Sequence, residues 1–136
     1  MLDVLRNWLQ TYPRWEGTLG IDYADGVPGN SGLYPKGMTE LSRREDVLGN
    51  LKIRCGYTFT LQRAALPGEE NARWLLDFQN WVMEQERLGL VPKFGDEPKT
   101  ERFRAFEGQL DTHTQAGCAL YTVRLYAEFT KIYEVN

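Results

Sequence analysis

Apolar and polar residues alternate almost without a break from Leu51 to Leu61, which predicts a strand with one face in a core. The preceding segment, Thr39–Val47, can be written as a second strand, and the residues between them, Leu48–Asn50, are suited to a turn. These segments therefore predict a β-hairpin. Its first strand is unusually charged through four consecutive residues: Arg43, Arg44, Glu45 and Asp46.

Two other segments have apolar residues at the three- and four-residue spacing of amphipathic helices. The first runs from Leu2 to Thr11 and is stopped by Pro13. The second runs from Gly68 to Leu88, and Gly89 is its stop signal. A helix of this length measures about 30 Å and can cover one face of a small sheet. Its apolar stripe is formed by Trp74, Leu75, Phe78, Trp81, Val82 and Gln85.

Three further segments predict strands. Leu19–Tyr23 alternates briefly, and Cys118–Val135 alternates over most of its length. Thr100–Thr112 has no single clean period, and Gly108 within it marks a bulge. The segment His113–Gly117 predicts the turn between the last two strands.

Two segments rich in glycine and proline, Asp25–Gly37 and Gly89–Lys99, predict loops. Loops of this length are uncommon in compact domains and are usually functional or disordered. The order of elements along the 136 residues predicts one α+β domain. We expect a four- to five-stranded, mostly antiparallel sheet, with the long helix packed on one face and a short N-terminal helix.

The composition is that of a folded globular protein, with 42% hydrophobic residues. The net charge of −3 argues against a dedicated nucleic-acid-binding protein, which usually carries a basic excess. No apolar run approaches the roughly 20 residues that cross a bilayer, so we expect no membrane partner. The N-terminal residues lack the basic and apolar regions of a signal peptide, and we expect none.

Residues that could carry chemistry are few. His113 is the only histidine, and it falls in a predicted turn, where a solvent-exposed side chain is the simplest interpretation. Cys55 falls on the apolar face of its strand and Cys118 on the polar side of another, so we expect free thiols rather than a disulfide. No Cys or His spacing suits zinc, and no glycine motif suits a phosphate. We therefore expect no enzymatic activity, cofactor or metal.

The charged strand has two interpretations that the sequence leaves open. Charges on an exposed edge strand protect it against aggregation, which needs no partner. Alternatively, the polar face of Arg43–Asp46 lies in a subunit interface.

Several segments together resemble one family. They are Leu41–Asn50, Tyr57–Leu61, Asn71–Leu75 with Phe78, Gln79 and Trp81, Lys131–Glu134, Trp8–Pro13 and Val27–Pro35. They resemble small proteins encoded in the head–tail modules of long-tailed phages and prophages of Gram-positive bacteria. Such proteins are usually labelled minor capsid protein and are similar to tail terminator proteins. The resemblance covers nearly the full chain, and none of its motifs is a catalytic signature.

The resemblance implies a structural protein that assembles with itself into a hexameric ring. The ring would end growth of the tail tube, and of the sheath in a contractile tail, and would present a surface to the head–tail connector protein. DNA would pass through the ring only as cargo. The protein would then occur in the bacterial host cytoplasm during assembly, and afterwards in the virion or a tail-like particle.

The resemblance also implies where subunits meet. The charged strand can line an interface or the lumen, and the two long loops can reach a neighbour or the tube. The candidate interface residues are Arg43, Arg44, Glu45, Asp46, Tyr34, Lys36, Lys93 and Phe94. Two alternatives stay open: a head-side completion or connector protein of the same module, and a small soluble enzyme or ligand-binding domain.

Overall fold

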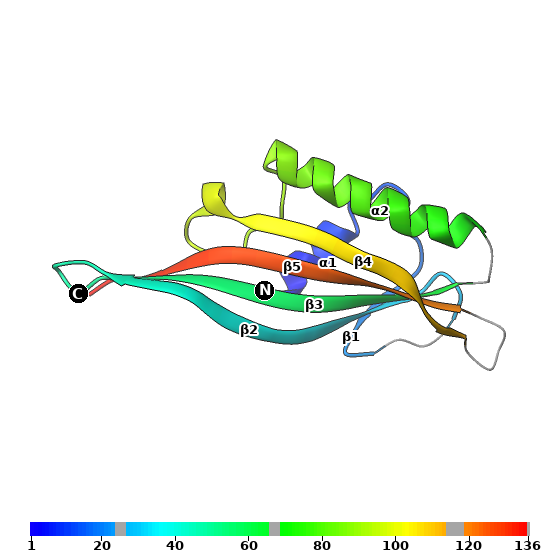
Figure 1. The fold of residues 1–136 in the computed structure, drawn as a ribbon, viewed down its shortest axis with the longest axis horizontal. Coiled ribbons are helices and arrows are strands. Elements are labelled where there is room, and N and C mark those ends of the chain that lie inside the picture. The colour runs from blue at the N-terminus through cyan, green and yellow to red at the C-terminus, as the bar shows by residue number, and fades with distance from the viewer. Residues whose placement is uncertain (24–26, 66–68, 114–118, 136) are drawn as a thin grey trace.

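A single five-stranded sheet and two helices make up the fold in the computed structural model, which describes residues 1–23, 27–65, 69–113 and 119–135 (Figure 1). The strand order is β1-β2-β3-β5-β4. The strand β1 is parallel to β2 and the other neighbours are antiparallel, so the sheet is mixed. The predicted α+β class is therefore confirmed. The elements are α1 (Leu2–Leu9), β1 (Leu19–Ile21), β2 (Ser31–Glu45), β3 (Leu51–Ala65), α2 (Glu69–Leu88), the 3₁₀ turn η1 (Pro98–Thr100), β4 (Arg102–His113) and β5 (Ala119–Tyr133).

The predicted loop Asp25–Gly37 is wrong in its second half, because β2 already begins at Ser31. Proline and glycine argued against a strand there, but Pro35 and Gly37 flank a shift in the pairing of β2 with β3. Bulges and edge strands are the places where a sheet accepts these residues. Residues 24–26 of the predicted loop lie outside the described part of the chain.

Side chains of both helices and of the sheet share one hydrophobic core. On α2, the rings of Trp74 and Phe78 stack with centroids 5.3 Å apart, and Tyr12 meets both rings edge-on. Alternate residues of β3 and β5 enter the same core, as a period of two requires. The buried residues include Leu5, Leu9, Tyr12, Leu33, Phe59, Leu61, Trp74, Phe78, Val82, Phe103, Val123, Leu125 and Phe129.

Three details of β4 and its surroundings refine the predictions. The predicted bulge is confirmed by a pairing shift between Phe106 and Gln109, although Glu107 is the residue with positive φ, at 55°. The backbone of His113 pairs with Ala119 as the end of β4, so its assignment to a turn is wrong. The remainder of that turn, residues 114–117, lies outside the described residues, as does residue 118, the second cysteine.

The first cysteine and the end of the long helix behave as the sequence indicates. Cys55 is a buried free thiol on β3, and burial is the main cause that raises its pKa. Gly89 has a φ of 73°, the left-handed conformation in which a glycine commonly ends a helix.

Candidate assembly interface

The β2–β3 hairpin projects beyond both helices, together with the C-terminal end of β5 (Figure 1). We call this projection the arm and define it as residues 38–54 and 130–135. Glu45 pairs with Leu51, which in turn pairs with Tyr133, so three strands continue to the end of the arm. Every residue of β2 from Lys36 to Glu45 is exposed. Backbone pairing rather than side-chain burial therefore holds this part of β2 in place.

The turn at the end of the arm is organised by Asp46. Its carboxylate accepts hydrogen bonds from the backbone N–H groups of Leu48 and Asn50, both at 2.9 Å, and from the Asn50 amide at 3.0 Å. These bonds, those from Asn50 first, lower the pKa of the Asp46 carboxyl below its ordinary value. Asp46 therefore belongs to the turn, and the predicted strand ends two residues earlier than Val47.

The three other charged residues of this stretch lie on β2 and are exposed. Arg43 is tied to its own strand, because its Nε lies 2.6 Å from Oε1 of Glu40. Within the described part of the chain, neither Arg44 nor Glu45 has an ion-pair partner. One cation and one anion on this strand are thus available to another molecule.

A polar cleft of about 330 Å³ runs along the arm, from Arg54 and Thr130 at its root to Arg44 near its end. On its other side, Lys52 forms an ion pair with Glu97 at 2.5 Å. Arg54 donates to the backbone oxygen of Thr100 at 2.8 Å and to the Thr130 hydroxyl at 3.1 Å. The arm is therefore tied at its root to the segment that contains η1.

The same segment extends the sheet where β4 has not yet begun. The backbone N–H of Asp96 donates to the oxygen of Thr130 at 2.7 Å, and the Asp96 carboxylate accepts from the N–H of Ile132 at 2.8 Å. Because β4 starts only at Arg102, opposite Glu128, these bonds occupy an edge of β5 that would otherwise be unpaired.

The structure does not bring the remaining four candidate residues to the arm. Tyr34 is half-buried on the first half of β2, and the Nζ of Lys36 lies 5.8 Å from the centre of its ring. The Lys93 ammonium donates to the backbone oxygens of two residues of its own loop, at 3.1 and 3.0 Å. Phe94 packs on core rings, 5.8 Å from that of Phe129. Within the subunit, Lys93 and Phe94 therefore stabilise a loop.

Sequence reasoning missed two pairs of exposed apolar residues. Val47 and Leu48, in the turn of the arm, are 102% and 75% exposed. Leu76 and Met83, on α2, are 60% and 68% exposed. A signal for the second pair was present, because the two residues are seven apart and therefore share a helix face outside the predicted apolar stripe.

Other kinds of site are not found in the described residues. They hold no group of three or more His, Cys, Asp or Glu side chains that could bind a metal ion. None of the described helices is both long enough and apolar enough to cross a bilayer. No protein-family model and no curated protein matches the chain.

Proposed function

We propose that this protein is a structural assembly protein of the tail terminator type, which closes into a hexameric ring at the end of a phage tail tube. The observation that carries the proposal is the arm, whose β2 residues are all exposed from Met38 to Glu45. A cyclic ring needs two different surfaces on each subunit that meet head to tail. An element that projects beyond the helices can supply one of these surfaces (Figure 1).

The way in which the arm is held also supports a role in assembly. A two-stranded hairpin alone is only marginally stable in water. Here the end of β5 adds a third strand, and Asp96 and the Lys52–Glu97 ion pair brace the root. A pre-ordered arm loses less conformational entropy when it meets a partner, which favours association.

The unpaired charges fit the same role. Arg44 and Glu45 keep the exposed edge of β2 soluble before assembly, as charges on edge strands do. In an interface, the same residues can give register and partner specificity, because like charges brought together cost several kcal/mol. The resemblance of Leu41–Asn50 to phage head–tail proteins concerns this same part of the chain.

In this proposal the protein acts by binding alone. One face of the ring complements the last ring of the tail tube, and of the sheath where the tail is contractile. The opposite face does not accept a further tube ring and instead receives the connector protein of the head. DNA passes through the lumen as cargo. Assembly takes place in the bacterial host cytoplasm, and the ring stays in the virion or tail-like particle.

The first test measures assembly directly. The mass of the protein in solution is determined by light scattering, alone and after addition of assembled tail tubes. We expect six copies at one end of each tube, even if the free protein is monomeric, because some rings close only on a template. A protein that stays monomeric in the presence of tubes contradicts the proposal.

The second test reverses one charge on the arm. We expect Arg44→Glu to fold normally but to give tails of uncontrolled length and few tailed heads, counted by electron microscopy. The control is Arg87→Glu at the end of α2, which breaks the 2.5 Å ion pair with Glu84 but lies outside the arm. If Arg44→Glu gives normal tails, this strand is not part of the interface.

A further inference from the structure

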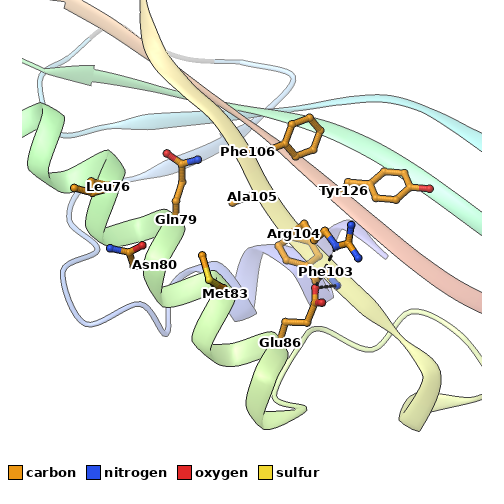
Figure 2. A pocket seen from close by; sticks show the side chains of 10 residues that line it. All are labelled: Leu76, Gln79, Asn80, Met83, Glu86, Phe103, Arg104, Ala105, Phe106 and Tyr126. Carbon is orange, nitrogen blue, oxygen red and sulfur yellow. Dashed lines mark hydrogen bonds and ion pairs between the residues drawn. The ribbon is translucent and has the colours of Figure 1, made fainter.

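An apolar groove of about 740 Å³ lies along the outer edge of the sheet, between α2 and β4 (Figure 2). Side chains of α2 form one wall, among them Leu76 and Met83, and β4 forms the other through Phe103, Ala105 and Phe106. Leu76 and Met83 are more than half exposed. An exposed apolar surface of this kind commonly marks a place where another protein binds.

Basic side chains lie at one end of this groove. Arg104 lines the groove itself, and Arg102 lines an adjoining cleft that shares Glu86 with it. The two side chains are 69% and 60% exposed, and each forms an ion pair with Glu86 at 3.9 Å. The same carboxylate also accepts the backbone N–H of Phe103 at 3.1 Å. Two guanidinium groups thus share one carboxylate that is already engaged. An incoming surface with negative charge would compensate this excess.

The turn of the arm has the complementary character. Val47 and Leu48 present apolar side chains to solvent, and the segment 45–50 contains two carboxylates and no cation. Val135, whose N–H donates to the Asn50 side chain at 2.9 Å, adds an apolar residue that is 62% exposed, and Glu134 beside it adds a third carboxylate. We call residues 45–50 with 134–135 the tip.

We propose that the tip of the arm docks in the α2–β4 groove of a second copy of this chain. This inference rests on the proposed function and deepens it, because it names the two surfaces through which a ring would close. Val47 and Leu48 enter between Leu76 and Met83, and Glu45 faces Arg104 at the basic end of the groove. The arm points away from its own body, so the groove it fills belongs to a neighbour (Figure 1). Such a contact is head to tail and repeats around a ring.

Cross-linking between copies tests the contact itself. A chain with Leu48→Cys is mixed with a differently tagged chain with Met83→Cys and oxidised, and mixed disulfides are separated on a gel. We expect the mixed dimer to form above the background of the parent chain, which keeps its own cysteines. The matched control replaces Met83→Cys by Val4→Cys, on α1 and 40% exposed, and should lose the product. Equal yields with both partners overturn the proposal.

A charge exchange tests the pairing of the tip with the basic end of the groove. We expect Arg104→Glu to weaken self-association, measured by sedimentation, by about tenfold or more, because close charge pairs in interfaces couple strongly. The double variant Glu45→Arg/Arg104→Glu should regain the lost affinity. A double variant as weak as the sum of the two single changes overturns the pairing.

The outcomes separate this inference from the proposed function. Rings on tail tubes without the Leu48–Met83 cross-link overturn the docking and leave the terminator function in place. A second combination would support the docking and overturn the terminator function. In it, the cross-link and the charge rescue are found, but the protein stays monomeric when it is mixed with tail tubes at physiological concentration. Tails are also normal in Arg44→Glu. Absence of both the cross-link and the rescue overturns the docking whatever the tails look like.

Discussion

The two ends of β2 differ in what surrounds them, although they belong to one strand. Leu33 is 0% exposed and lies in the core, whereas Met38 and Leu41 are 61% and 44% exposed on the arm. Packing holds the first end, and backbone pairing with polar ties holds the second. A substitution at the body end should therefore change the free energy of unfolding, while a substitution on the arm should chiefly change association.

The largest effect is expected for Phe78, in the middle of the core. Phe78→Ala should lower the free energy of unfolding by about 3–5 kcal/mol, because it removes a buried ring and leaves a cavity. Urea unfolding measures the change. Leu76→Ala is the matched control on the same helix. Because this side chain is exposed, its loss should change the free energy of unfolding by about 0.5 kcal/mol or less. Equal midpoints for the two variants contradict this description of the core.

A smaller loss of stability is expected for a substitution where the arm meets the body. Asp96→Ala removes the acceptor of the Ile132 N–H and should cost about 1 kcal/mol. Hydrogen exchange should show faster exchange at Ile132 and its neighbours, with no change in β3 near Phe59. The exposed neighbour Lys99→Ala serves as the control. Unchanged exchange at Ile132 shows that this bond does not brace the arm.

A local effect of pH is expected in the turn. The pKa of Asp46 is below its ordinary value of 3.8, so the ionised carboxylate stabilises the turn at higher pH, and this contribution is lost as the pH falls through the lowered pKa. In an NMR titration, the amide signals of Leu48 and Asn50 should shift together in this acidic range. Asp46→Ala should abolish the shift. Amide signals that shift with a midpoint above pH 3.8 would contradict a lowered pKa for Asp46.

The smallest effect on stability is expected for Arg44. Its side chain is exposed and has no ion-pair partner among the described residues, so Arg44→Glu should change the free energy of unfolding by at most about 0.5 kcal/mol. Thermal unfolding followed by circular dichroism measures it. A loss of more than about 1 kcal/mol indicates that Arg44 supports the fold, and the contrast between the two ends of β2 then fails.

The sequence predicted best where a periodic pattern records burial on one side only. The alternation of β3 follows burial from Ile53 to Leu61, where every second residue lies in or against the core, and the stripe on α2 repeats because one helix face does; Leu51 continues the pattern on the arm, outside the core. The start of β2 could not be read in this way. Ser31, Gly32 and Leu33 are all buried, so they show no alternation, and nearby proline and glycine indicated a loop.

The candidate interface was predictable only in part. The run from Arg43 to Asp46 does stand on the arm, but its members differ in role, since only the structure shows that Asp46 holds the turn and that Arg43 is tied to Glu40. The groove could not be predicted, because it combines α2 with β4, and their proximity depends on the tertiary fold. In the sequence, Lys93 looked available to bind a partner. Its two hydrogen-bond acceptors are backbone oxygens, which only the folded loop brings to it.

The aromatic cluster of the body determines what fluorescence can report. All four tryptophans lie in or against the core: Trp8, Trp15, Trp74 and Trp81. Trp74 and Trp81 contact the rings of Tyr12 and Phe78, Trp8 contacts Trp81, and Trp15 contacts Trp74. The arm contains none of the four tryptophans. Tryptophan emission will therefore record melting of the body while remaining silent about fraying of the arm. A tryptophan placed at Leu48 would give the arm a spectroscopic signal of its own.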